Sequence, residues 1–129
     1  MAISGFPTTT GDVLTSSTMN SLVQFDVVTQ TNDYTATTND NYQELQLMNK
    51  ATAIAFKIPT NASVAFPIGT VITVLNIGAG TCTISAVTSG TTTVLSAGAT
   101  AAAPTLGQYK SAACIKTGTD TWYVVGAIA

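Results

Sequence analysis

The chain has 129 residues, a formal net charge of −2 at pH 7 and only 8% charged residues, and it contains no His and no Arg. Binding to nucleic-acid phosphates needs clustered cations, whereas Lys50, Lys57, Lys110 and Lys116 are scattered. Without His, the usual proton shuttle at neutral pH and the commonest metal ligand are both missing. We therefore expect a single domain that is not an enzyme, needs no metal or other cofactor and binds no nucleic acid.

The sequence shows neither a membrane segment nor a secretory signal. No apolar run approaches the ~20 residues that a membrane-spanning helix needs, and the opening from Met1 to Phe6 is too short and uncharged for a signal peptide. We therefore expect synthesis in a cytosol and no membrane partner. Thr, which makes up about a fifth of the chain, can cover the solvent faces of strands with neutral hydrogen-bonding groups.

Residues 1–31 differ in character from the rest of the chain. Pro7 and the Thr-rich stretch after it favour an extended arm, and Thr15 or Ser16 can cap a short helix with apolar residues at helical spacing. Such a helix is too short to be stable alone, so it must pack on another surface, for example as a lid on its own domain. The candidate interface residues of this segment are Phe6, Pro7, Val13, Leu14, Met19, Leu22 and Val23.

Residues 32–58 are expected to form three short strands separated by polar turns. Asn32-Asp33 and residues 39–41 mark turns on either side of a strand at residues 34–38. Residues 42–48 alternate in a way that predicts a strand half-buried at best. Residues 53–58 continue the alternation, and Pro59 ends this third strand.

The run TVITVLNI at residues 70–77 is almost continuously apolar. It predicts a strand covered on both faces, either inside a sandwich or at a subunit contact, and it adds Val71, Ile72 and Val74 to the candidate interface. The G-A-G sequence at residues 78–80 then turns the chain into the next strand. The remaining predicted strands lie at residues 81–86, 91–95, 109–117 and 121–128, with the last two forming a hairpin.

About eight short strands and at most one helix indicate an all-β domain over residues 32–129. The spacing of the strands favours an antiparallel β-sandwich, and we expect a jelly-roll-like topology. No constant repeat period is visible, which argues against a regular β-solenoid.

One cluster of carboxylates is dense enough to suggest acid–base chemistry. Asp33, Asp40 and Glu44 lie in or beside a polar turn, where Asp usually accepts hydrogen bonds from backbone N–H groups. Their spacing with Asn39 and Asn41 does not match a Ca²⁺-binding loop. We therefore expect these side chains to stabilise a turn.

Two cysteines and two aromatic residues also have structural explanations. Cys82 and Cys114 are expected to be buried small hydrophobic residues and not a disulfide. Trp122 and Tyr123 could form a platform for stacking sugars, but strand alternation places them on opposite faces, and we expect Trp122 to lie in the core.

The order of short motifs is more informative than any one of them. Ile58-Pro59 is followed by VAFPIGT at residues 64–70, a β run, GAG at residues 78–80, another β run and KTGTDTW at residues 116–122. This succession, from about residue 34 to the end, resembles the small β-domains of tailed-phage fibres, spikes and head-surface proteins. GDVLTSSTMNSL at residues 11–22 is similar to the openings of phage fibre and head-surface proteins. This similarity implies that residues 1–31 mediate attachment or trimerisation, an interpretation as good as that of a lid.

The resemblance implies a non-enzymatic structural protein of a phage virion, made in the host cytoplasm. It implies a homotrimeric capsid decoration or cement protein that binds the major capsid protein on the exterior of the head and stabilises it. The alternative is a receptor-binding tail-fibre or tailspike module that contacts a glycan or protein of the host surface. Because only a short arm and no long shaft precedes the domain, we expect the head surface.

Overall fold

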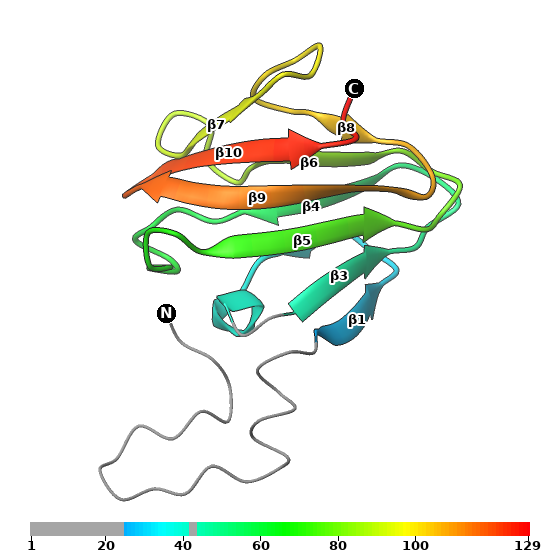
Figure 1. Ribbon diagram of the computed structural model, residues 1–129, viewed down its shortest axis with the longest axis horizontal. Helices are drawn as coiled ribbons and strands as arrows, with labels where there is room; N and C mark the ends of the chain where they lie inside the picture. Colours follow the sequence, from blue (N-terminus) through cyan, green and yellow to red (C-terminus); the bar gives the residue numbers. More distant parts are fainter. Residues whose placement is uncertain (1–24, 42–43) are drawn as a thin grey trace, which may run out of the picture.

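The computed structural model describes residues 25–41 and 44–129, and this part of the chain is almost entirely β (Figure 1). Its one helical element is a single turn of 3-10 helix, η1, at Thr38–Asn41, and no helix in the described ranges is long and apolar enough to cross a membrane. The fold class is therefore all-β, as predicted. The strands are β1 (Asp26–Gln30), β2 (Tyr34–Thr35), β3 (Glu44–Met48), β4 (Ile54–Ile58), β5 (Val71–Asn76), β6 (Cys82–Ala86), β7 (Thr93–Ser96), β8 (Thr105–Leu106), β9 (Lys110–Gly118) and β10 (Thr121–Gly126).

The strands form two sheets. Sheet A has six strands in the order β1-β3-β5-β9-β10-β7, and sheet B has four in the order β2-β4-β6-β8. In Figure 1 sheet A lies in front, with β4 and β6 behind it. From β1 to β6 the chain alternates between the two sheets, so each strand from β3 on pairs with the strand two places earlier in the chain. The four pairings are all parallel: β3 with β1, β4 with β2, β5 with β3 and β6 with β4.

The prediction of purely antiparallel strands is wrong, and the jelly-roll-like topology is not confirmed. Among the described strands, five pairings are parallel and three are antiparallel. The cause is the winding of the chain, because a strand that returns to the same sheet after one full circuit runs in the same direction as its neighbour. The circuits differ in length: Leu45 lies 18 residues after its partner Val27, whereas Thr73 lies 28 residues after Leu45. The sequence therefore has no constant repeat period.

Most strands lie where the sequence predicts them, but β1 was not predicted. It pairs with β3 along its whole length, so residues 26–30 belong to sheet A and the predicted domain boundary between residues 31 and 32 lies too late. The short helix predicted after Thr15 falls outside the described residues. Phe25, which directly precedes β1, is an exposed residue of this region.

The core lies between the two sheets and follows the alternation of their strands. Sheet A contributes Met48, Ile72, Val74, Cys114, Trp122 and Val124, and sheet B contributes Ile54, Phe56, Ile58, Cys82, Ile84 and Leu106. The inward prediction for Ile54, Phe56 and Ile58 is confirmed. The Trp122 ring meets Phe66 edge-on, with 5.6 Å between ring centroids and an interplanar angle of 89°, a favourable geometry for aromatic pairs.

The GAG motif connects β5 to β6 at a place where two circuits of the chain touch. A Cβ atom at Gly78 would lie 2.3 Å from the backbone of Lys50, and one at Gly80 would lie 1.8 Å from the backbone of Thr52. The buried Asn76 amide fixes this turn by donating to the carbonyl oxygens of Gly80 and Leu106. Only glycine fits at these two positions, which accounts for the motif.

Candidate functional site: the outer face of sheet A

The outward side chains of sheet A form a continuous surface without charged residues. Register places thirteen of them in three rows across the sheet, which together define the sheet A outer face, and Thr93, Thr117 and Thr121 lie outward beyond the first row. The rows are Leu95, Tyr123, Ile115 and Val71; Val125, Ala113, Thr73, Leu45 and Val27; and Ser111, Leu75, Leu47 and Thr29. Ten of these thirteen side chains are apolar or aromatic, and the other three are Thr or Ser.

Several of these apolar side chains are substantially exposed in the single chain. Exposed fractions are 57% for Val27, 52% for Val71, 49% for Val125, 43% for Tyr123 and 36% for Leu95. Single exposed apolar residues are ordinary on protein surfaces, but a contiguous uncharged patch of this kind marks an interaction surface. The sheet A outer face is therefore the strongest candidate for a contact with another protein.

The outer face of sheet B provides an internal comparison, because the same chain covers it with polar side chains. Thr35, Lys57 and Ser85 form one row, and Ala55, Thr83 and Thr105 form the next. The Lys57 ammonium donates to the Ser85 hydroxyl at 3.2 Å. Sheet B has the outward surface expected of a sheet that faces water, and sheet A does not.

Two shallow hollows border the sheet A outer face. One of about 230 Å³ lies beside β5 and includes Phe25, Ile68 and Val71 in its lining. The other, of about 420 Å³, lies at the β7–β10 side and includes Leu95, Tyr123 and Ile128. Their apolar linings extend the uncharged surface beyond the sheet, so that a protruding side chain of a partner could be seated at either border.

The structure divides the candidate interface residues of β5 between two faces. Val71 lies on the sheet A outer face, whereas Ile72 and Val74 are fully buried in the core. The prediction of Ile72 and Val74 as interface residues is wrong, because alternate residues of a strand point to opposite faces and theirs is the face toward sheet B. The other candidates, Phe6, Pro7, Val13, Leu14, Met19, Leu22 and Val23, lie outside the described residues.

The carboxylate cluster forms a buried hydrogen-bond network, and its main acceptor is Asp40. Asp40 accepts hydrogen bonds from the Tyr34 hydroxyl at 2.6 Å, the Thr37 amide at 2.8 Å and the Gln46 side chain at 2.7 Å. Burial, reinforced by the hydrogen bond to Asp40, raises the pKa of Tyr34 to about 12. Burial, together with the charge of Asp40, also raises the pKa of Glu44. The turn-stabilising interpretation of Asp40 is confirmed.

Asp33 has the same kind of role, because its carboxylate accepts a hydrogen bond from the Ala55 amide at 3.0 Å. It thereby ties the turn after β1 to the start of β4. The described residues contain no group of three or more His, Cys, Asp or Glu side chains arranged to hold a metal ion.

Cys82 and Cys114 are both buried free thiols, as the sequence predicts. Burial raises the pKa of Cys82 to about 11 and that of Cys114 to about 12, so both stay protonated. Trp122 is buried, which confirms its predicted core position, and Tyr123 on the opposite face is exposed.

A second polar cluster surrounds Lys116. It was not predicted from the sequence. This lysine is only 2% exposed, and its ammonium donates to Asn61 Oδ1 at 2.6 Å and to the Phe66 carbonyl oxygen at 2.7 Å. The Asp120 carboxylate accepts hydrogen bonds from the Asn61 backbone N–H at 2.8 Å and from the Thr92 hydroxyl at 3.1 Å. The KTGTDTW motif contains both residues of this cluster that lie on the hairpin. Its Lys116 and Asp120 connect the corner between β4 and β5 to the β9–β10 hairpin through hydrogen bonds.

Comparisons with models of known protein families, with curated protein sequences and with solved structures found no match.

Proposed function

We propose that this protein is a non-enzymatic structural protein of a tailed-phage virion. In this proposal it associates with copies of itself through the sheet A outer face and decorates the exterior of the capsid. The observation that carries the proposal is the contrast between the two outer faces, uncharged and apolar on sheet A but polar on sheet B. The succession of motifs from Ile58-Pro59 to KTGTDTW supports the phage assignment by resemblance.

Comparison of the free energy of apolar burial with the cost of association favours a contact that uses the whole sheet A outer face. Covering the exposed half of an apolar side chain contributes roughly 1 kcal/mol, so the five substantially exposed side chains contribute on the order of 5 kcal/mol, and the five half-buried ones add less. Association costs about 4–15 kcal/mol in lost freedom of movement. A few of these side chains would not hold an oligomer together, so the proposed contact uses the full face together with its two flanking hollows. The trimeric state of the proposal comes from the resemblance.

Attachment to the capsid is assigned to the residues before β1. Because β1 is a strand of sheet A, the attachment segment of the proposal is residues 1–24, and the β-domain includes residues 26–30. By linkage, a protein that binds only the assembled shell stabilises it against disassembly.

Co-sedimentation tests this function. Full-length protein is expected to sediment with undecorated capsids and to raise their resistance to heat, whereas protein lacking residues 1–24 is expected to stay folded and to remain in the supernatant. Equal binding by both proteins would remove the attachment role of residues 1–24. Absence of capsid binding by the full-length protein would overturn the decoration function.

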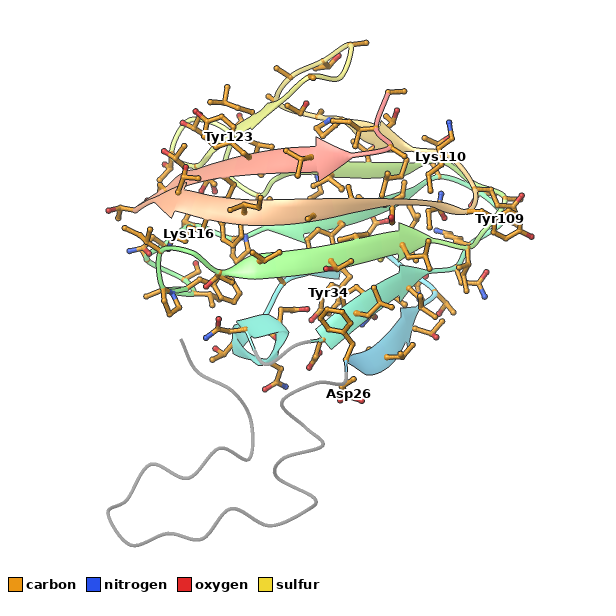
Figure 2. All side chains as sticks on the ribbon, in the orientation of Figure 1. Asp26, Tyr34, Tyr109, Lys110, Lys116 and Tyr123 are labelled. Atoms are coloured by element: carbon orange, nitrogen blue, oxygen red, sulfur yellow. The ribbon has the colours of Figure 1, made fainter. Side chains whose placement is uncertain are left out.

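Receptor binding is the second candidate function, and one loop favours it. Tyr109 is 75% exposed and has a backbone φ of 64°, a conformation that side-chain-bearing residues rarely adopt. Figure 2 shows Tyr109 beside Lys110 at the end of the molecule opposite Lys116. An exposed aromatic residue held in a strained conformation is suited to stacking on a glycan.

The two functions are distinguished by adding host cells to the same sedimentation experiment. Receptor binding predicts that the protein sediments with cells and that Tyr109→Ala reduces this binding, with no effect of capsids. Decoration predicts capsid binding that Tyr109→Ala leaves unchanged.

A further inference from the structure

The Lys116 side chain is a buried amine next to the Phe66–Trp122 aromatic pair. Lys116 is the register partner of Trp122 in the β9–β10 hairpin, and its ammonium bonds to the carbonyl oxygen of Phe66, the residue whose ring contacts Trp122. Figure 2 shows Lys116 near the end of β9. Burial lowers the pKa of this lysine, an effect that the charge of Asp120 opposes. Such an environment increases the share of the neutral, nucleophilic form of the amine.

The side-chain amide of Asn61 lies directly against this amine. Lys116 Nζ is 2.6 Å from Asn61 Oδ1, so the carboxamide carbon is within about 3.8 Å of Nζ, given the length of a C=O bond. Short separations between reacting atoms in a fixed environment are the main requirement for an intramolecular reaction. The two residues are 55 positions apart in the sequence, so only the fold brings them together.

Asp120 holds Asn61 from the other side. Its Oδ1 accepts the Asn61 backbone N–H at 2.8 Å and is itself fixed by the Thr92 hydroxyl at 3.1 Å. Asp120 is also the carboxylate whose charge acts on the Lys116 amine. The chain thus places an amine, a carboxamide and a carboxylate in one part-buried cluster, so the reacting groups and a nearby charge are held together by the fold.

We propose that Lys116 and Asn61 join through a covalent isopeptide bond that the folded chain forms by itself. The neutral Lys116 amine attacks Asn61 Cγ; the Nζ–Cγ bond forms and the Cγ–Nδ2 bond breaks. One proton passes from Nζ to the departing nitrogen, and ammonia leaves. The Asp120 carboxylate holds Asn61 through its backbone N–H, and its charge favours the positive charge that develops on Nζ. No oxidant, reductant or cofactor takes part, and no other atoms are gained or lost.

The bond would fasten the corner between β4 and β5 to β9, next to the Phe66–Trp122 pair. It closes a loop across most of the β-domain, so it would oppose unfolding by heat or by force much as a disulfide does. It is independent of self-association and of the capsid, since all three groups belong to one chain.

Mass spectrometry of the purified full-length protein tests the proposal without any substitution. The intact mass is expected to be about 17 Da below that of the encoded chain, the mass of one ammonia. Trypsin, which cleaves after Lys57 and Lys110 but not after a modified lysine, is expected to release residues 58–110 joined to residues 111–129. A mass equal to the encoded chain, with separate peptides 111–116 and 117–129, would overturn the proposal.

Two variants separate the isopeptide from cyclisation of Asn61 with its own backbone, which also releases ammonia. Lys116→Arg is expected to abolish the mass loss if Lys116 is the nucleophile, and a loss that persists in this variant would overturn the proposal. Asp120→Asn retains both reacting groups, and it is expected to slow the mass loss. Thr83→Ala, on the outer face of sheet B, serves as a control and is expected to react fully.

Discussion

Leu95 and Tyr123 are register partners on β7 and β10, and both side chains point away from the core onto the sheet A outer face. Val94 and Trp122, one residue earlier on the same strands, are buried. This pair of strands therefore has apolar side chains on both faces, although among residues 25–41 and 44–129 only one face is covered. A second protein surface is the simplest cover for the other face.

Charge introduced on the sheet A outer face is expected to dissociate the oligomer without unfolding the chain. Val125→Lys places an ammonium in an apolar contact, where its desolvation is costly, so we expect the dissociation constant to rise at least about tenfold. The melting temperature of the isolated chain should change little, because Val125 is exposed there. Thr83→Lys, on the sheet B outer face, is the matched control and should leave association unchanged. Analytical ultracentrifugation of the three proteins measures the difference, and equal dissociation by both variants would contradict the assignment of the face.

Neighbouring aromatic residues on β10 are expected to contribute very differently to stability. Trp122→Ala removes a buried ring that contacts Phe66, and such substitutions cost about 3–5 kcal/mol. Tyr123→Ala alters an exposed side chain and should cost less than about 1 kcal/mol in the monomer. Urea denaturation under conditions that keep both variants monomeric gives the two values. Similar losses for both would show that the assignment of inner and outer faces is wrong.

The raised pKa of Glu44 predicts a pH dependence of stability. A carboxyl group whose pKa is higher in the folded chain than in the unfolded chain binds protons more tightly when folded, so its ionisation destabilises the fold as pH rises through and above its ordinary value of 4.5. Glu44→Gln should therefore be more stable than the wild type at pH 7 and lose this advantage at pH 3. Thermal melts of both proteins across this range provide the test, and a constant difference at all pH values would speak against the predicted linkage.

The two cysteines are expected to resist alkylation in the native protein. Their thiols are buried and protonated at neutral pH, whereas the reactive form is the exposed thiolate. Iodoacetamide should label neither residue in native buffer and both in denaturant, as counted by intact mass. Reductant alone should not change the melting temperature. Rapid native labelling of Cys114 would show that the core opens at this position.

The sequence predicted the positions of most strands because alternation and turn residues are local signals. Residues 54–58, 71–76 and 82–86 lie within one residue of the predicted ranges. Strand pairing was not predictable in the same way, since the partner of Leu45 is set by the length of the circuit that leads to Thr73. β1 was missed because the apolar residues just before it suggested a helix.

The candidate site was only partly visible for related reasons. The apolar run at residues 70–77 predicted a strand covered on both faces, but among the described residues only the face of Ile72 and Val74 is covered and Val71 is exposed. The run could not show which residues face the core. The burial of Lys116 could not be predicted from the sequence, because lysines are usually exposed and its hydrogen-bond partner Asn61 is 55 residues away. Asp40 was correctly assigned to a turn, whereas its buried partner Gln46 lies on a strand that was predicted to be half-buried at best.

The central claim, self-association through the sheet A outer face, is tested most directly by light scattering of the full-length wild-type protein at micromolar concentration. We expect the mass of a trimer of the 13.2 kDa chain, and we expect Val125→Lys to shift this mass toward that of a single chain. A wild-type protein that scatters as a 13.2 kDa monomer at this concentration would contradict it.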